Sequence, residues 1–379
     1  MFSPPFCPYE GCSNHLNPAE RNWYYRKGYY STKAFGPVAR YRCRACGKGF
    51  SRQTFRLDYY VKRPLDYREL AFAINSGSGL RALARKLGVG HHSIINRIGR
   101  LARQSVGMTA ELLFEVQSII QENFAIDGFE SFVSSQYEPN NIHLLVGTES
   151  QFLYDFDYAH LKRKGRMSEE QKRERERREL LLVRPRVSIS ASFANLSASL
   201  RALIVRRLPE QSCLFTDEKL EYQRVLNTSP LFIHLQRIGL FAHRRFSSKL
   251  PRTPYNPLFS VNYLDREVRK NNANHVRETV QFSRSVNNCL ERVALFQLLH
   301  NYFKPYRVDH REKKEYLHAE IAGIARASVE RALGQIFERR RFYSHVRTRL
   351  SASQELVWRR AVGNVDRYDG GYTAKYVFM

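Results

Sequence analysis

Apolar and polar positions alternate with different periods along the chain. Three short apolar stretches, 124–132, 141–147 and 150–157, are rich in β-forming residues and predict the consecutive strands of an antiparallel meander. A further short run, 213–215, has the length of a buried strand. Residues 271–303 repeat their apolar side chains with a helical period, which predicts one long helix. Strands and helices interspersed in this way predict a mixed α/β fold.

The apolar side of the predicted long helix consists of Val276, Val280, Val286, Leu290, Val293, Phe296 and Leu299. A second helical pattern lies in residues 66–104. Leu80, Leu83, Ala84 and Leu87 keep helical spacing, "LGVG" makes a turn, and Ile94, Ile98 and Leu101 restart the period. Two helices joined by a tight turn are typical of a helix-turn-helix.

The second helix of this pair carries polar and basic groups away from its apolar stripe. They are suited to contact base edges and phosphates in a DNA major groove: His91, His92, Ser93, Asn96, Arg97 and Arg100. The alternative is an ordinary helical hairpin with a solvated basic face.

The charge of the chain favours the first of these interpretations. Among 379 residues, 62 Lys and Arg stand against 36 Asp and Glu, a net charge of +26, which indicates a polyanionic partner such as nucleic acid. The 43% hydrophobic and 13% aromatic residues argue for folded domains. No apolar run reaches the length of a membrane-spanning helix, and the first residues lack a signal-peptide pattern. We therefore expect a cytoplasmic, reducing compartment and no membrane partner.

Four of the six cysteines lie before residue 47. Cys7 and Cys12 lie in "CPYEGC", and Cys43 and Cys46 lie in "YRCRACGKGF". Two close pairs separated by about thirty residues predict a structural zinc site with four thiolate ligands. His15 is an alternative ligand in place of Cys12, because four residues rather than two separate the first pair.

The segment between the two cysteine pairs, "RNWYYRKGYYSTKAFGPVARYRC", alternates aromatic side chains with Arg and Lys. A hairpin with this pattern can stack aromatic faces against a ligand and meet phosphates with its basic groups. The aromatic side chains can equally be the packing of a domain that is too small for a large core.

Acidic residues occupy conspicuous positions in the predicted α/β region. Asp127 ends an apolar run in "FAIDGFESF", Asp217 ends one in "CLFTD", and Glu278 lies near the start of the predicted long helix. Two strand-end aspartates and a glutamate on a helix across the sheet can converge on Mg²⁺, which takes oxygen ligands. The alternative for Asp127 is a strand that simply ends in an Asp-Gly turn. Three further acids compete with Glu278 for the third position: Asp265, Glu267 and Glu291.

The order of a zinc ribbon, a helix-turn-helix and then Asp, Asp and Glu resembles bacterial insertion-sequence transposases of the DDE class. The local sequences "AIDGFE", "TDEKLEY" and "NPLFSVNYLDREVRKNNANHVRETVQFSR" are similar as well. The resemblance covers residues 5 to about 304, and extends more loosely through "HAEIAGIARASVERALGQIFERRRF". It implies an RNase H-like catalytic core in which Asp127, Asp217 and Glu278 bind two catalytic Mg²⁺ or Mn²⁺ ions.

The resemblance also implies phosphoryl transfer on double-stranded DNA, first at the terminal repeats of the element and then on target DNA. Around the third acid, Asn274, His275, Arg277 and Arg284 would hold DNA. Because an element has two ends, a homodimer or larger assembly is expected, associated with the nucleoid in a bacterial cytoplasm. A non-catalytic DNA-binding regulator and a metal-dependent nuclease that does not join strands are the alternatives.

These patterns together predict a multidomain α/β protein. We expect a zinc ribbon at 1–62, a helix-turn-helix domain at 63–110, an RNase H-like catalytic domain at 120–304 with a basic insertion near 160–210, and a helical, basic and aromatic C-terminal region at 305–379. Within the insertion, the pairs Glu169 with Arg173 and Glu174 with Arg178 predict an exposed helix.

Overall fold

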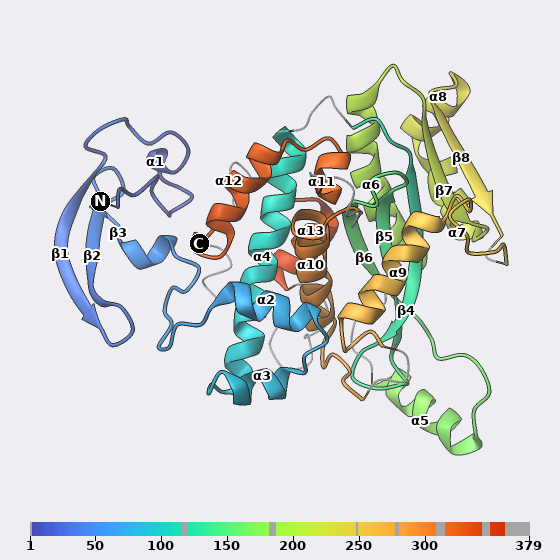
Figure 1. The fold of residues 1–379 in the computed structure, drawn as a ribbon, viewed down its shortest axis with the longest axis horizontal. Coiled ribbons are helices and arrows are strands. Elements are labelled where there is room, and N and C mark those ends of the chain that lie inside the picture. Colours follow the sequence, from blue (N-terminus) through green and yellow to red (C-terminus); the bar gives the residue numbers. More distant parts are fainter. Residues whose placement is uncertain are drawn as a thin grey trace.

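The computed structural model describes residues 2–115, 120–181, 187–247, 249–276, 280–307, 315–342 and 349–360. These residues form a mixed α/β protein with thirteen α-helices, one short 3-10 helix and two β-sheets (Figure 1). The smaller sheet belongs to an N-terminal module at one end of the molecule, and the larger sheet lies toward the other end among most of the helices. The predicted mixed α/β class is confirmed.

The N-terminal module is a three-stranded antiparallel sheet with the order β1-β2-β3. Its elements are α1 (Ser13–Leu16), β1 (Tyr24–Thr32), β2 (Gly36–Cys43), β3 (Gly49–Ser51) and the 3-10 helix η1 (Arg52–Phe55). Its small core is mostly aromatic and includes Phe342 from near the other end of the chain. The ring of Phe342 lies 5.4 Å from that of Phe6 and 5.5 Å from that of Phe55, measured between centroids. The module is therefore completed by a residue outside the predicted boundary of 1–62.

The helices that follow are α2 (Tyr67–Asn75), α3 (Leu80–Lys86) and α4 (His91–Glu115). The Asp66 carboxylate caps α2 by accepting hydrogen bonds from the backbone N–H groups of the first turn. Gly88, with φ of +60°, makes the turn between α3 and α4 in a left-handed conformation that favours glycine. Leu83, Ile94 and neighbouring apolar side chains are buried. The two helices and the turn predicted from the apolar spacing are confirmed.

The larger sheet has five strands in the order β6-β5-β4-β7-β8. Its strands are β4 (Phe124–Phe132), β5 (Pro139–Gly147), β6 (Leu153–His160), β7 (Ser212–Asp217) and β8 (Phe241–Phe246). The first three pair antiparallel, which confirms the predicted meander. Strand β7 pairs parallel with β4, and β8 pairs parallel with β7.

Helices cover both faces and one edge of this sheet (Figure 1). Helix α6 (Ile189–Arg207) packs on β5 and β6, whereas α9 (Phe259–Asn271) packs on the opposite face of β4 and β5. Helix α10 (Val286–Tyr302) runs beside β6, where the Asn301 side-chain amide bonds the Leu153 backbone, so this edge strand is not left unpaired. Helices α7 (Leu220–Thr228) and α8 (Pro230–Arg237) connect β7 to β8.

The long helix predicted for 271–303 is wrong in its first half. Helix α9 ends at Asn271 and α10 begins only at Val286, after Ser285, whose hydroxyl accepts a hydrogen bond from the Asn288 N–H and caps the helix. Val276 and Val280, which were expected on the apolar side of one helix, are 45% and 91% exposed. The helical period was maintained by residues that belong to the connection between two helices.

The basic insertion contains α5 (Glu169–Leu180), which has no buried residue and projects away from the rest of the molecule (Figure 1). The predicted pair of Glu174 and Arg178 is present, with 2.6 Å between Oε1 and Nε. Glu169 pairs with Lys172, at 2.6 Å, and not with the expected Arg173. The prediction of an exposed helix is confirmed.

The C-terminal part contains α11 (His318–Ile321), α12 (Arg326–Ile336) and α13 (Ala352–Arg359). Two buried acids of β6 hold the start of α13. The Asp155 carboxylate accepts hydrogen bonds from the hydroxyls of Ser199 (2.6 Å) and Ser351 (2.7 Å), and Asp157 accepts one from Ser353 (2.6 Å). No helix among the described residues combines the length and the hydropathy needed to cross a membrane.

Candidate active site and candidate metal centre

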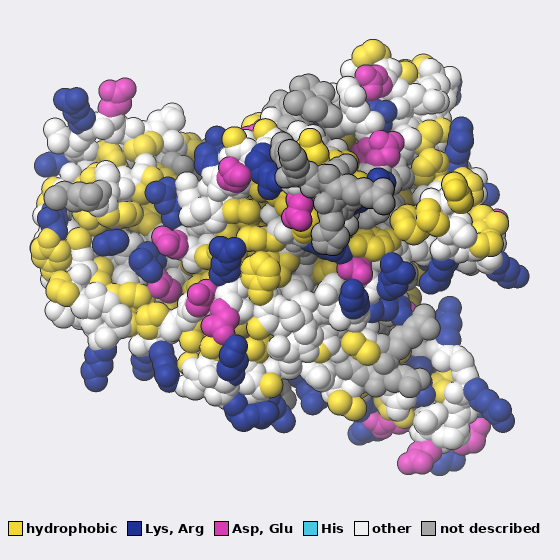
Figure 2. All heavy atoms as spheres, viewed as in Figure 1, with side chains coloured by type: hydrophobic (Ala, Val, Ile, Leu, Met, Phe, Trp, Pro, Cys, Tyr) yellow, Lys and Arg dark blue, Asp and Glu magenta, His cyan; other side chains and the backbone are white. Residues whose placement is uncertain are grey.

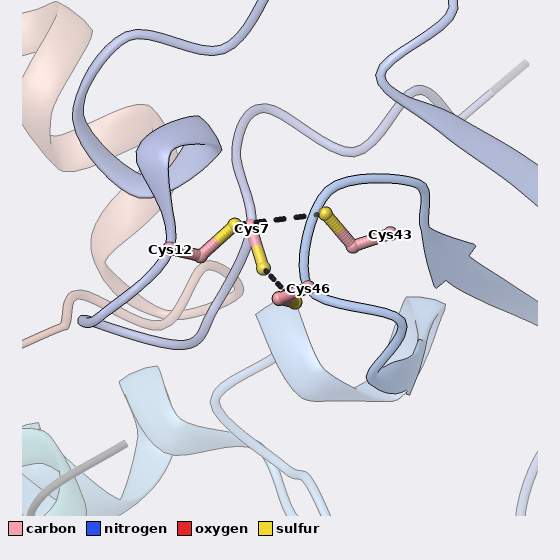
Figure 3. A group of neighbouring side chains, drawn as sticks. All are labelled: Cys7, Cys12, Cys43 and Cys46. Atoms are coloured by element: carbon pink, nitrogen blue, oxygen red, sulfur yellow. Dashed lines mark hydrogen bonds between the residues drawn. The ribbon is translucent and has the colours of Figure 1, made fainter.

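The four predicted cysteines of the N-terminal module converge (Figure 3). Their sulfur atoms all lie within 4.8 Å of one another, and the Sγ atoms of Cys7 and Cys46, and those of Cys12 and Cys43, are 3.7 Å apart. A tetrahedral zinc site with metal–sulfur bonds of about 2.3 Å separates its sulfurs by about 3.8 Å. The cluster therefore has the donor set and the spacing to bind a metal such as zinc.

The surroundings favour a thiolate at Cys43, whereas burial raises the pKa of the Cys7 and Cys12 thiols. Burial raises the pKa of the Cys43 thiol, but N–H groups of Cys46 and Ala45 and the Asn14 amide favour its thiolate and lower the pKa overall, to about 7. His15, the alternative ligand, is not in the cluster. Its Nδ1 lies 2.7 Å from the carbonyl oxygen of Cys7 and so contacts the backbone of a cysteine ligand.

Asp127 and Asp217 meet at the centre of the larger sheet. The expectation that Asp127 ends its strand or begins a turn is wrong, because β4 runs on to Phe132. Strand β7 ends at Asp217, while β4 continues past Asp127, so the two side chains face each other across neighbouring strands. The Lys219 ammonium lies between them, 3.3 Å from the Asp127 carboxylate and 2.8 Å from that of Asp217. Because both carboxylates contact one nitrogen, the prediction that the two aspartates converge is confirmed.

A third acid, Asp265 on α9, is close enough to Asp127 and Lys219 for their charges to act on it. Its Oδ1 is buried and has no hydrogen-bond partner among the described residues. Burial, followed by the nearby Asp127 carboxylate, raises the pKa of Asp265 well above its ordinary value. The unpartnered oxygen of Asp265 and the nearby Asp127 carboxylate are oxygen donors of the kind that divalent cations take.

The other acids considered for the third position lie elsewhere or outside the described residues. Glu267, also on α9, forms an ion pair with Lys304 at 2.7 Å. Glu291 is buried on α10, where Arg360 lies 3.1 Å away. Glu278 lies outside the described residues. Among the described candidates, Asp265 alone has its pKa raised by Asp127.

The protonation of the site depends on the balance between burial and Lys219. Burial raises the pKa of Asp127, the Lys219 charge lowers it, and the Asp217 charge raises it again, with a net upward shift. Burial lowers the pKa of Lys219, but Tyr222 and the two aspartates raise it overall, so this side chain remains charged. Two ionised carboxylates and one ammonium have a net negative charge. A half-buried site with this charge is suited to a divalent cation.

Sequence reasoning did not single out three residues of this site. Lys219 and Tyr222 lie within "TDEKLEY", and the Tyr222 hydroxyl is 3.3 Å from the Lys219 ammonium. His143 lies behind Tyr222, with 5.7 Å between ring centroids, and burial lowers its pKa to about 3, so it is neutral. The sequence signal that could have identified Lys219 is its position two residues after Asp217, the last residue of β7.

Four residues were expected to hold DNA near the third acid. Asn274 and His275 are buried, and the His275 Nδ1 lies 2.8 Å from the Ser131 hydroxyl. Burial lowers the pKa of His275 to about 3, so the prediction that these two face DNA is wrong: both belong to the packing of the connection between α9 and α10. Arg284 is exposed, and Arg277 lies outside the described residues.

The basic face predicted for α4 is only partly accessible. His92 is exposed, and His91, Ser93 and Asn96 are partly exposed. Arg97 and Arg100 are 8% and 6% exposed, so the prediction that they point outward is wrong. The Arg100 guanidinium donates to the backbone carbonyls of Leu57 and Tyr59, which satisfies a buried charge inside the protein.

Comparisons with known proteins do not assign the chain to a family. No family model matches it, and no curated protein matches it. The function proposed below is therefore inferred from the geometry of the two sites, from the charge of the chain and from the resemblance of the sequence to DDE transposases.

Proposed function

We propose that this chain is a DNA transposase that cuts and joins DNA strands at the ends of a mobile element in a metal-dependent reaction. The observation that carries the proposal is the contact of Asp127 and Asp217 with one Lys219 ammonium, with Asp265 close enough to Asp127 for their charges to interact. The strand order, an antiparallel meander followed by two strands parallel to its first member, supports an RNase H-like core for the domain.

In this proposal the three aspartates hold Mg²⁺ or Mn²⁺, two ions in the active complex. Bound divalent cations supply Lewis acidity and lower the pKa of a water or sugar hydroxyl that attacks a phosphodiester. The carboxylates of Asp127, Asp217 and Asp265 would hold the ions. Lys219 contacts the carboxylates of Asp127 and Asp217, and the Tyr222 hydroxyl contacts Lys219.

Positive groups beside the site are suited to the scissile phosphate. Arg252 and Arg269 are close enough to Asp265 for their charges to lower its pKa, and Arg252 is exposed. Arg269 donates to the Glu130 carbonyl, which fixes its position beside β4. Guanidinium groups held in this way form charge-assisted hydrogen bonds to phosphate oxygens.

The N-terminal part supplies DNA recognition in this proposal. A structural zinc ion in the four-cysteine cluster fixes the small module, and α3 and α4 form a helix-turn-helix that enters a major groove through His91, His92 and Ser93. The net charge of +26 supports binding to duplex phosphates. Because a mobile element has two ends, we expect a homodimer or larger assembly that binds both, associated with nucleoid DNA in the cytoplasm.

The proposal is tested by cleavage and strand transfer on DNA that carries the sequences flanking the gene, with Mg²⁺. We expect Asp217→Asn and Asp265→Asn to bind this DNA normally and to lose both activities, because each removes an ion ligand. Glu267→Gln on the far side of α9 is the matched control and keeps activity. Glu278→Gln is compared in the same assay.

The outcomes separate the candidates. Loss of activity in Glu278→Gln with full activity in Asp265→Asn assigns the third ligand to Glu278 and corrects the proposed triad. Cleavage without joining identifies a nuclease. A native chain that binds the DNA and never cuts it, at any divalent ion tested, overturns the catalytic proposal in favour of a DNA-binding regulator.

A further inference from the structure

A cavity of about 860 Å³ opens between the N-terminal sheet and the chain that leaves it. Its lining residues come from β1, β2, β3 and η1, and include Tyr60 and Arg340. Its volume falls within the range of about 300 to 1,000 Å³ that is usual for small-molecule and cofactor sites. Figure 2 shows Lys and Arg side chains among hydrophobic ones over this end of the molecule.

The charge of the cavity is of one sign. Lys27, Arg40, Arg42 and Arg340 line it, and none of its lining residues is acidic within the described part of the chain. Lys27 and Arg40 are exposed and form no ion pair with any described residue. Two exposed cations that form no ion pair among the described residues and line one cavity are suited to an anionic ligand.

Tyrosines provide a second kind of contact. The Tyr60 side chain is 88% exposed, and its backbone has φ of +53°, a left-handed conformation that a bulky residue seldom adopts. Such strain recurs at binding sites, where it holds a side chain in a required position. Tyr30, which is 37% exposed, also lines the cavity. Exposed aromatic faces beside cations are the surface on which unstacked nucleobases bind.

A third observation comes from the floor of the cavity. Gln53 on η1 is only 8% exposed, and its side-chain carbonyl oxygen has no hydrogen-bond partner among the described residues. A buried amide that lacks a partner is costly, so such groups usually meet a ligand or water. The amide of glutamine can pair in bidentate fashion with the edge of a base, adenine above all.

We infer that this cavity binds one unpaired DNA nucleotide, with the base stacked on Tyr60, its edge read by Gln53, and its phosphates held by Lys27 and Arg40. A fully paired duplex keeps its base faces stacked inside the helix and cannot use Tyr60 in this way. The inference rests on the proposed function for the choice of DNA, and adds that this end of the protein recognises a flipped or frayed nucleotide.

The test compares binding of the full-length, zinc-loaded chain to two labelled DNAs by fluorescence anisotropy at one ionic strength. One is a paired duplex, and the other is the same duplex with a single extrahelical adenine. We expect the native chain to prefer the second DNA and Tyr60→Ala to weaken that binding about tenfold, with little effect on the paired duplex. Tyr29→Ala is the matched control, because Tyr29 is a 57% exposed tyrosine of β1 outside the cavity lining.

A cross-linking measurement identifies the residue in contact. With 5-iodouracil as the extrahelical base, we expect light-induced cross-linking to Tyr60 or Tyr30, located by mass spectrometry. Equal binding to the two DNAs, equal effects of the two tyrosine variants, or a cross-link only outside the cavity each overturns the inference. Stronger binding to single-stranded RNA than to the extrahelical DNA also overturns it, because the ligand is then RNA.

No step of these measurements depends on cleavage. A chain that fails the strand-transfer test and yet prefers the extrahelical DNA retains this binding site and loses the proposed activity. A chain that cuts and joins DNA without that preference retains the activity and loses the nucleotide site.

Discussion

Removing the charge of Lys219 tests the electrostatics of the candidate active site directly. In Lys219→Met, the carboxylates of Asp127 and Asp217, whose side chains are only 18% and 12% exposed, face each other without the ammonium that now contacts both. Removing one partner of a buried ion pair costs about 3 to 5 kcal/mol, and the 30% exposure of the Lys219 side chain places the expected loss near 3 kcal/mol at pH 7.

The matched control is Lys172→Met. Lys172 is 2.6 Å from Glu169, a distance similar to that between Lys219 and Asp217, but both side chains are largely exposed. Exposed ion pairs contribute between about 0 and 1 kcal/mol, so this variant loses at most about 1 kcal/mol. The assay is urea unfolding followed by circular dichroism, with the free energy of unfolding compared at several pH values.

The pH dependence has a definite sign. The folded-state pKa of Asp127 is raised, chiefly by burial, so its ionisation destabilises the folded chain as pH rises through that pKa. Without Lys219 this upward shift grows. We therefore expect the loss in Lys219→Met to be largest at neutral pH and to shrink as the solution is acidified. Added Mg²⁺ replaces the lost positive charge and stabilises the variant more than the native chain. Equal losses in the two lysine variants, or a loss that grows in acid, would refute this reasoning.

Three further predictions concern other parts of the molecule. Burial raises the pKa of Asp155 to about 6, so this group destabilises the fold as pH rises from about 4 to 7, and Asp155→Asn flattens the profile of unfolding free energy against pH over that range. Gly128→Ala places a Cβ 1.7 Å from a side-chain oxygen and lowers the melting temperature, whereas Gly334→Ala, which meets nothing within 4 Å in a helix, raises it slightly. Cys43→Ser reduces the zinc released on denaturation, measured with a colorimetric chelator, from one ion per chain toward none.

Much of the local structure follows from periodicity in the sequence. The strands of the meander, the paired cysteines and the helices on either side of Gly88 were predicted because each depends on residues that are close in sequence. The convergence of Asp127 with Asp217 was predictable in part, since each acid follows a buried apolar run and the two strands are parallel neighbours. The sequence did not indicate that β4 continues past Asp127 to Phe132.

The features that were missed depend on partners distant in sequence. Arg100 has the helical position of a surface residue. It is buried because its guanidinium donates to the carbonyl groups of Leu57 and Tyr59, which lie in the chain before α2. The connection between α9 and α10 keeps an apolar period by chance, so Ser285, a capping residue, was the only local sign of a new helix. Asp265 was one of several acids, and only the packing of α9 on β4 distinguishes it from Glu267, two positions further along.

The position of Phe342 has a consequence for the order in which the chain folds during synthesis. Domains usually fold from the N-terminus as the chain leaves the ribosome. Here the aromatic core that surrounds the cysteines lacks Phe342 until the whole segment between Phe55 and Phe342 has been made. This module is thus completed only after the larger sheet and most of the helices that follow it in sequence, and early acquisition of a metal by its cysteines would protect it from misfolding in the meantime.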